Sequence, residues 1–525
     1  MSETPENEIF PVVVIGAGIA GLTAAAHLAD GGVAPLVLEA DHSWPGGRLS
    51  GGEPVTLAHH GQTWTFSDEH GIHAVWGGYA NLRATLERFT DTRLIDSPGE
   101  EWINRWGREV RMIEAGNAVR SRWLPAPFHY LQLLFHPHIW RTITPLDFLS
   151  LPGLLFSILW TVGLDPLKEE IALDGLTMDD YFRLWTPNLK ATFVGVGCNL
   201  LAAPKETISL TAFIAALRFY TMLRRDAWHM QYFPAPPHES LLTPLIQHLE
   251  ARGGQVRYGA AVTRLERVAQ GWRIVFEDAN RRGLRSVMAE QVILAVQPPA
   301  AQRLLTASAS TATEAAQIKF PGAVRNATIR LWFSKAPRAG TPGGMFTGDF
   351  LPDNFFWLHR LYDDFAAWHD ATGGSAIEVH LYAGKDVLEQ PDNILLIQTL
   401  DEVQRAFPEL RGHLLHSTIR RNSLNHTQFR VPTRASLWLE TPWPGITACG
   451  DWIGYDTSTF WMERAATTGI AAANSVLTAH GQTPYPLLQP PQPEWLVRVL
   501  GALVRGLRAT VGRVIIGAAR TAKRR

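Results

Sequence analysis

The 525-residue sequence predicts an α/β protein in which one domain is assembled from segments that lie far apart in the chain. Two observations predict this class. A strand, a glycine-rich turn and a helix follow one another within the first fifty residues, and a second strand, turn and helix, centred on Gly450 and Asp451, come near the end. The long stretch between them is sufficient for a separate α+β domain. We therefore expect an inserted domain.

The first pattern is typical of a dinucleotide site. The apolar run 12–15 reads as a buried parallel strand, and a helical pattern follows it. Gly16 permits a tight turn, Gly18 lets a diphosphate approach the backbone, and Gly21 lets helix and strand pack closely. The free N–H groups at the start of the helix would then bind the diphosphate. This combination predicts a Rossmann-like fold.

Two further features extend this first site. Glu39 follows Gly21 by 18 residues, where a carboxylate accepts hydrogen bonds from a ribose and disfavours the 2′-phosphate of NADP. Gly46 and Gly47 allow a second close approach of the backbone, and Arg48 supplies a guanidinium for phosphate oxygens.

The second pattern favours FAD over NAD. A strand at 446–449 ends in Gly450-Asp451, and an alanine-rich helix is expected over 460–477. Asp451 can accept hydrogen bonds from ribityl hydroxyls, and the start of the helix can face the flavin ring, where negative charge collects on reduction. The absence of a second GxGxxG argues against reductases that hold FAD and NAD(P)H in separate domains.

The paired segments resemble those of the FAD-dependent amine oxidase and phytoene desaturase superfamily. Its members open with GxGxxG, an acidic residue and GGR, and close with a GD-containing strand and a helix over the flavin. The resemblance implies non-covalent FAD, an adenine contact at Val262 and a strand that returns to the flavin near Ala295. The implied cofactor-binding residues are Gly16, Gly18, Ala20, Gly21, Glu39, Ala40, Gly46, Gly47, Arg48, Val262, Ala295, Gly450, Asp451, Trp461 and Met462.

Residues 67–89 resemble the carotenoid desaturase branch, which includes the desaturase/methyltransferases that aromatise carotene end rings. Hydroxysqualene dehydroxylases carry a related pattern, and this sequence departs from the aromatising enzymes after His73. Glu69, His70 and His73 would act as proton acceptors or stabilise an allylic cation beside the flavin. In the other interpretation, the glycine shapes a loop under the flavin ring and the histidines are structural.

The composition limits which partners, metals and cellular compartments we expect. A formal net charge of −1 gives no reason to expect nucleic acid as a partner. The two cysteines, Cys198 and Cys449, cannot build a disulfide framework, and no CxxC or HExxH pattern predicts a metal. The acidic, polar N-terminus does not read as a signal peptide, so we expect a cytoplasmic protein.

An uncharged apolar stretch covers residues 148–164, with Pro152 near its start. It lies at the lower edge of the length that spans a membrane. A transmembrane helix is disfavoured. We expect either a helical hairpin that lines an apolar tunnel or dips into one leaflet, or a buried core helix.

The C-terminal tail, 495–525, follows a proline-rich linker at 481–494. It carries eight Lys or Arg residues and no acidic residue. On a helix, one face would gather Arg498, Arg505, Arg508, Arg513 and Arg520. Such a basic amphipathic helix suits an anionic membrane, and packing on the protein body is the alternative. We expect peripheral attachment to the cytoplasmic face of the membrane.

These elements predict an FAD-binding domain over 8–98, 235–300 and 436–480. A substrate domain would comprise 99–234 and 301–435, with helices in 125–230 that are able to contact a membrane, and with strands at 328–333 and 377–382. The expected activity is desaturation of a long apolar isoprenoid such as a carotenoid, by hydride transfer to flavin N5. A redox-neutral flavin isomerase of carotenoids and an amine oxidase are the alternatives, and oxygen or a membrane quinone would accept the electrons.

Overall fold

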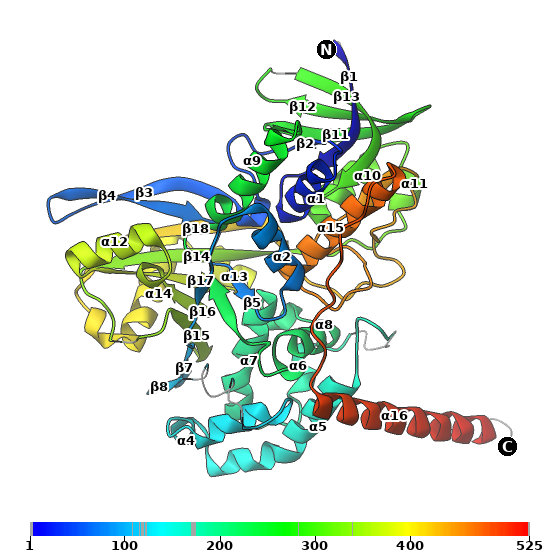
Figure 1. Ribbon diagram of the computed structural model, residues 1–525. Coiled ribbons are helices and arrows are strands. Elements are labelled where there is room, and N and C mark those ends of the chain that lie inside the picture. Colours follow the sequence, from blue (N-terminus) through cyan, green and yellow to red (C-terminus); the bar gives the residue numbers. More distant parts are fainter. Residues whose placement is uncertain are drawn as a thin grey trace.

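The computed structural model describes residues 4–107, 109–114, 116, 120, 123–169, 175–281, 283–338 and 340–522. Its α/β architecture contains two seven-stranded sheets, with a group of helices at one end of the molecule (Figure 1). The expected α/β fold class is confirmed.

The first sheet has the order β10-β2-β1-β13-β12-β11, and β19 pairs with β13. Its strands are β1 (Thr4–Ile15), β2 (Leu36–Leu38), β10 (Gln255–Arg257), β11 (Ala260–Val268), β12 (Gly271–Asp278), β13 (Gly283–Leu294) and β19 (Ile446–Ala448). The pairings of β1, β2, β10, β13 and β19 are parallel, whereas β11, β12 and β13 run antiparallel. The sheet therefore joins strands from three distant parts of the chain.

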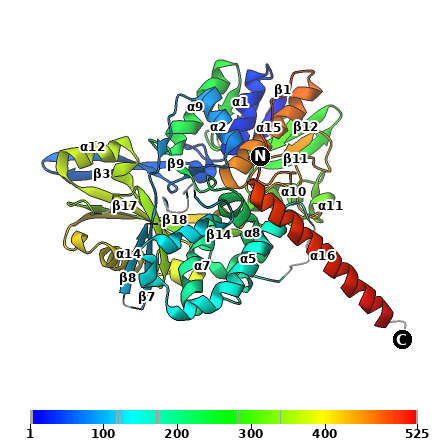
Figure 2. The same ribbon diagram turned by 60° about the horizontal axis from the view of Figure 1, so that its bottom comes forward.

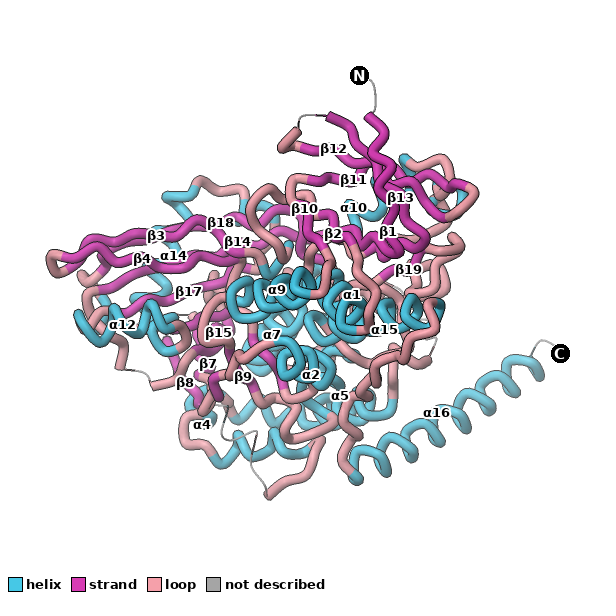
Figure 3. The backbone as a smooth tube through the Cα atoms, turned by 45° about the horizontal axis from the view of Figure 1, so that its top comes forward, coloured by secondary structure: helices cyan, strands magenta, loops and turns pink. Residues whose placement is uncertain are grey.

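Helices α1 (Ile19–Asp30), α9 (Thr243–Ala251) and α15 (Trp461–Ala479) lie side by side over this sheet (Figure 3). The carboxylate of Glu463 in α15 accepts hydrogen bonds from the backbone N–H groups of Asn81 and Leu82, both at 2.9 Å, at the start of α2 (Ala80–Phe89). Burial raises the pKa of Glu463 to about 7, against the effect of these donors. The last helix of the domain thus binds directly to its first segment.

The second sheet has the order β18-β14-β17-β16-β15-β7-β8. Its strands are β7 (Glu101–Trp106), β8 (Glu109–Glu114), β14 (Ala323–Phe333), β15 (Gly343–Gly348), β16 (Asn354–Trp357), β17 (Ser375–Leu381) and β18 (Leu414–Thr427). The pairing of β7 with β15 is parallel and the others are antiparallel. The strands expected at 328–333 and 377–382 are β14 and β17. Helices α12 (Asp363–Thr372) and α14 (Asp392–Ala406) pack against this sheet.

The sequence analysis assigned the hairpin of β3 (Gly51–His59) and β4 (Gln62–Glu69) to the first domain, but the hairpin packs with the second sheet. It extends along the second sheet (Figure 1), where Phe66 is buried against Trp332 and Trp368. The cause is apolar burial, because the fully buried Phe66 ring finds its aromatic partners on β14 of the second sheet and on the neighbouring helix α12. A smaller sheet joins β5 (Ala74–Trp76), β9 (Met230–Tyr232) and β6 (Ile95–Asp96).

The helical end of the molecule contains the apolar stretch expected at 148–164. The 3₁₀ helix η3 (Pro145–Ser150) continues directly into α5 (Leu151–Gly163). Together they are long and apolar enough to cross a membrane by length and composition, and 44% of this stretch is buried. Neighbouring elements are η2 (Phe128–Phe135), α4 (Ile139–Thr142), α6 (Met178–Tyr181), α7 (Pro187–Leu201) and α8 (Leu210–Leu217).

The tail forms a single helix, α16 (Trp495–Ala522), whose first turns pack on α5 and whose end projects from the body (Figure 2). Val497 is buried in a cluster with Ile158 and Val162. The Arg508 guanidinium donates to the carbonyl of Gly163 at 2.8 Å and pairs with Glu169 at 3.0 Å. The tail is thus fixed to the body at its start. The side chains of Arg513 and Arg520, expected on its basic face, lie outside the described residues.

The close packing of helix α1 on strand β1 depends on Gly21. A Cβ atom there would lie 2.1 Å from the carbonyl oxygen of Gly16, whereas a Cβ at Gly18 would have no atom nearer than the Gly46 oxygen at 4.0 Å. We expect Gly21→Ala to lower the free energy of unfolding of the ligand-free protein by about 1–3 kcal/mol, as overpacking does. Gly18→Ala, the control, should change it by less than about 0.5 kcal/mol. Denaturant unfolding of both variants measures the difference, and equal losses would contradict the packing role of Gly21.

Candidate functional site

A cavity of about 690 Å³ lies between the two sheets and is lined by residues from both. It brings together most of the residues expected at a cofactor site, although they come from three distant segments. Those in its wall are Gly16, Gly18, Ala20, Glu39, Ala40, Gly46, Gly47, Arg48, Val262, Ala295, Gly450, Asp451, Trp461 and Met462, together with His70 and His73. Gly21 is not in the wall, because it lies beneath the turn against Gly16.

One end of the cavity has the features of a dinucleotide cradle. Gly16 has φ +104°, a conformation that glycine adopts without strain, and the helix α1 begins directly after Gly18. The Glu39 carboxylate accepts hydrogen bonds from the backbone N–H groups of Ala17 at 2.7 Å and Asp41 at 2.9 Å. Burial raises the pKa of Glu39, and these donors oppose the shift. Glu39 is therefore held in place beside the glycine turn.

The GGR and GD segments meet at the centre of the cavity. Arg48 forms an ion pair with Asp451 at 2.7 Å, and its guanidinium lies 5.9 Å from the ring centre of Trp461. Trp461 has φ +46°, which is unusual for a bulky residue, and its indole N–H donates to the carbonyl of Leu200 at 2.9 Å. Backbone strain of this kind is found at ligand sites.

The loop containing Gly71 is held on the second sheet by hydrogen bonds. Its Ile72 N–H donates to Oε1 of Glu378 at 2.7 Å, and the Thr328 hydroxyl donates to the carbonyl of His70 at 3.2 Å. Arg330 donates to the carbonyl of Ser67 at 2.7 Å. These bonds fix the loop in the wall of the cavity, between the glycine turns and the second sheet.

Three histidines in the cavity wall are neutral at neutral pH. Burial lowers the pKa of His70 well below its usual range, that of His73 to about 4 and that of His426 to about 3. Among the described residues, none donates or accepts a hydrogen bond at Nε2 of His70, Nδ1 of His73 or Nε2 of His426. The wall thus offers buried polar atoms to a ligand without carrying positive charge on these rings.

Glu69 is not in the cavity wall, although the sequence placed it with the histidines as a proton acceptor. It is buried behind the loop, where it accepts a hydrogen bond from Tyr362 and lies 3.6 Å from Arg330. Burial and the nearby Glu378 raise its pKa well above the usual range. The structure therefore separates Glu69 from His70 and His73.

Glu378 is the ionised carboxylate of this region. Burial opposes its ionisation, but the guanidinium of Arg330 at 2.7 Å and the imidazole of His380 at 2.7 Å together outweigh burial and lower the pKa of Glu378 to about 2. Arg330 also pairs with Asp68 at 3.3 Å, and the three carboxylates raise its own pKa despite burial. The two charges of the Arg330–Glu378 pair are almost completely removed from solvent.

The sequence analysis did not single out His380 and Tyr382, which line the cavity beside His426 and Thr328. His380 Nε2 lies 2.7 Å from Oε1 of Glu378, and its Nδ1 lies 3.1 Å from the Tyr382 hydroxyl. A signal was present in residues 377–382, where apolar residues alternate with Glu378, His380 and Tyr382. This period of two places Glu378 and His380 on one face of β17, and Tyr382 follows directly after the strand.

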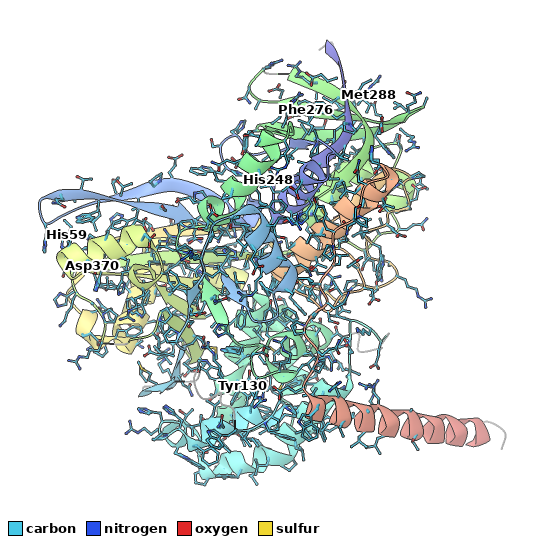
Figure 4. The ribbon with its side chains drawn as sticks, in the orientation of Figure 1. His59, Tyr130, His248, Phe276, Met288 and Asp370 are labelled. Carbon is cyan, nitrogen blue, oxygen red and sulfur yellow. The ribbon has the colours of Figure 1, made fainter. Side chains whose placement is uncertain are left out.

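A second cavity of about 160 Å³ lies in the helical end and is lined almost entirely by apolar residues, including Tyr130 of η2 (Figure 4). Trp228 lines this cavity, Trp76 lines the larger one, and their ring centres are 5.1 Å apart. Phe148 and Leu151 also line it, yet they are 48% and 51% exposed. An apolar space thus reaches from the aromatic wall of the main cavity to the exposed face of η3 and α5.

The residues of the main cavity fit a flavin nucleotide. The open space above Gly18 and the start of α1 suit a diphosphate, and Glu39 suits a ribose. Gly450 and Asp451 lie on the same cavity as the start of α15, which suits the rest of the cofactor. Within the described ranges, His, Cys, Asp and Glu side chains do not form a group of three or more that would hold a metal ion.

Two curated proteins are similar to this chain over most of its length. Over 487 residues the chain is 27% identical to a carotenoid phi-ring synthase from Streptomyces griseus, which covers 90% of this chain and 88% of that protein. It is 22% identical over 420 residues to a 15-cis-phytoene desaturase from Synechococcus elongatus, covering 76% of this chain and 80% of the relative.

Solved structures share the fold. A cyclohexylamine oxidase from Brevibacterium oxydans superposes with a TM-score of 0.62 at 15% identity, over 90% of this chain and 99% of the other. A putrescine oxidase bound to putrescine gives a TM-score of 0.61 at 14% identity, over 90% and 100%.

Family models agree with these relatives. Residues 14–89 match an NAD(P)-binding Rossmann-like domain, and residues 180–477, more than half of the chain, match the flavin containing amine oxidoreductase family. The protein therefore belongs to the flavin containing amine oxidoreductase family and is an oxidoreductase with a flavin cofactor.

Proposed function

We propose that this protein binds FAD non-covalently and desaturates a carotenoid at the surface of a membrane. The observation that carries the proposal is the similarity to a carotenoid phi-ring synthase along 90% of the chain. The apolar cavity behind Trp76 and Trp228 supports the same substrate class, because a long hydrocarbon needs more apolar space than the cofactor cavity offers.

When bound, FAD supplies the two-electron acceptor that takes a hydride from the substrate. The chain contributes the slot in which this happens. Trp76 and Tyr220 form part of the wall and exclude water, and the neutral rings of His70, His73 and His426 leave it without cationic charge from histidine. Oxygen or a membrane quinone would then accept the electrons.

The charge of the cavity favours a hydrocarbon over an amine. Within the described part of the chain, the carboxylates in the wall of the main cavity are Glu39 and Asp451. Glu39 binds backbone N–H groups and Asp451 pairs with Arg48, so neither is placed to hold a substrate ammonium.

The helical end supports attachment to a membrane, as a peripheral protein on its cytoplasmic face. Leu149 of η3 is 73% exposed and Leu155 of α5 is 50% exposed. Leu503 on the neighbouring α16 is 60% exposed, and the side chains of Arg498 and Arg505 are exposed on the same helix. Figure 1 shows α4, α5 and α16 at one end of the molecule. Apolar side chains with nearby cations suit the interface of an anionic bilayer.

Glu39 distinguishes FAD from FMN, because only FAD carries the adenosine ribose that Glu39 would bind. We expect Glu39→Gln to weaken FAD binding by about tenfold, in line with the loss of a charged hydrogen bond, and to leave FMN affinity unchanged. Fluorescence titration of the flavin-free protein measures both affinities. Equal weakening for the two flavins would contradict the assigned ribose contact.

The substrate class is tested in cells that accumulate phytoene, lycopene or β-carotene. Expression of the protein should move the absorption of one of these pigments to longer wavelength, since each new double bond extends the conjugated system. A Gly18→Val variant, in which the new side chain fills the space for the diphosphate, is the control and should leave the pigments unchanged. Release of hydrogen peroxide with polyamines or aromatic amines, without conversion of any carotene, would instead establish an amine oxidase.

Membrane attachment is tested by changing exposed leucines alone. The triple variant Leu149→Glu, Leu155→Glu and Leu503→Glu should reduce binding to anionic vesicles by at least about tenfold, because each buried leucine contributes about 1.5–3 kcal/mol. Ile397→Glu is the matched control, since Ile397 is 63% exposed on α14, outside the helical end. Co-sedimentation with vesicles measures binding, and equal binding by both variants and the unaltered protein would refute this surface.

A further inference from the structure

Desaturation, on which this inference rests, removes a proton as well as a hydride, so the cavity must contain a proton acceptor. Glu69 lies outside the wall, and its pKa is raised by burial. His70, His73 and His426 line the wall, but burial lowers the pKa of each. Among the described residues, no carboxylate is bound to Nε2 of His70, Nδ1 of His73 or Nε2 of His426. Glu378 raises the pKa of His73 from a distance, but burial outweighs this effect.

His380 differs from these histidines because an ionised carboxylate is bound to it. Oε1 of Glu378 accepts from the Ile72 N–H and lies 2.7 Å from Nε2 of His380, while Oε2 accepts from Nε of Arg330 at 2.7 Å. Arg330 and His380 together keep Glu378 ionised, so its oxygens can only accept hydrogen bonds. Nε2 of His380 therefore carries the ring proton.

The tautomer of His380 fixes the direction of the next hydrogen bond. With the proton on Nε2, Nδ1 of the neutral ring has a free lone pair and can only accept. The Tyr382 hydroxyl, 3.1 Å away, must then donate to it. The result is a chain of two hydrogen bonds in one direction, from the Tyr382 hydroxyl through His380 to the carboxylate of Glu378.

Two of the three residues joined by these hydrogen bonds are in the wall of the cavity. Both His380 and Tyr382 line it, and Gly71 lies directly against the imidazole, since a Cβ at Gly71 would be 3.1 Å from Nε2 of His380. Glu378 and Arg330 stand behind the ring, on β17 and β14.

Other titratable groups face Tyr382, His380 and Glu378 from the surrounding elements. His73 of the loop and His426 of β18 interact electrostatically with His380. Between β15 and β16, the Asp353 carboxylate accepts from the Tyr382 backbone N–H at 2.6 Å, and the Asn354 amide lies 3.4 Å from the Tyr382 hydroxyl. His73 and His426 are neutral, so they add no positive charge beside His380.

We propose that Tyr382, His380 and Glu378 form the proton-accepting relay of this oxidoreductase. As a hydride leaves one substrate carbon for the flavin, the C–H bond on the adjacent carbon breaks and its electron pair forms the new double bond. The proton passes to the Tyr382 oxygen while the hydroxyl proton of Tyr382 moves to Nδ1 of His380. Glu378 stabilises the imidazolium, as carboxylates do for catalytic histidines. Tyr382 is the catalytic residue in contact with substrate, and Glu378 is a positioning residue.

The kinetic test uses Tyr382→Phe and His380→Gln in the FAD-loaded protein, with the carotenoid that the unaltered protein converts. Both variants should slow anaerobic flavin reduction by about 100-fold, a typical contribution of a general base. In the unaltered protein the rate should fall at low pH, because a protonated His380 cannot accept a proton, and His380→Gln should lose this dependence. Flavin reduction should also be slower in D₂O, and this isotope effect should be absent in Tyr382→Phe.

Tyr232→Phe is the matched control, because Tyr232 is a buried tyrosine outside the cavity whose hydroxyl donates only to the sulfur of Met230 among the described residues, at 3.9 Å. It should retain the pH profile and the isotope effect. The FAD content of each variant, read from its absorbance, separates loss of the relay from loss of cofactor. Unchanged pH profiles and isotope effects in Tyr382→Phe and His380→Gln would overturn the relay.

A second measurement needs neither cofactor nor substrate. In flavin-free protein labelled with ¹⁵N-histidine, the resonances lost in His380→Gln identify His380, and they should show a proton on Nε2 and none on Nδ1. Tyr382→Phe should shift the Nδ1 resonance. A proton on Nδ1 would overturn the relay even if carotenoids are converted. If the unaltered protein converts no carotenoid, the proposed function fails, and the relay falls with it as a route for a carotenoid proton.

Discussion

The ion pair between Arg330 and Glu378 holds the site together. Both side chains are almost fully buried, and removing one partner of such a pair costs about 3–5 kcal/mol because a charge is left without compensation. Arg330 binds the carbonyl of Ser67 and Glu378 binds the N–H of Ile72, so the pair holds both ends of the loop that carries Gly71. That loop forms the wall between the glycine turns of one domain and the second sheet.

The same pair explains the different states of the acids around it. The guanidinium of Arg330 lies near three acidic side chains, two of them fully buried, and does not compensate them equally. Glu378, at 2.7 Å, is ionised, whereas Glu69, at 3.6 Å and fully buried, has a raised pKa. Asp68 shares a second cation, Arg420, at 3.2 Å. Residues adjacent in the sequence, Asp68 and Glu69, thus have different surroundings: Asp68 is partly exposed between two guanidinium groups, whereas Glu69 is fully buried.

The helical end follows a separate constraint, the burial of apolar surface. Helix α5 buries Ile158 and Val162 against Val497 of α16 while Leu155 and Phe156 stay exposed. The second cavity begins at this exposed face and ends at Trp228, one aromatic layer from the cofactor cavity. The same group of helices therefore supports two parts of the proposed function: an apolar substrate and attachment to a membrane.

The sequence by itself determined the α/β class, the glycine turn and the distant strand with Gly450 and Asp451, because strand and helix periodicity and the conformational needs of glycine are local properties. It also indicated the residues that the cavity gathers from three segments. The position of the β3–β4 hairpin, the separation of Glu69 from His70 and the joining of Glu378, His380 and Tyr382 to the site were decided only by the tertiary structure. These features depend on burial, on charge compensation and on the approach of β14 and β17 to the Gly71 loop. The residues involved are hundreds of positions apart, so local sequence patterns cannot predict such contacts.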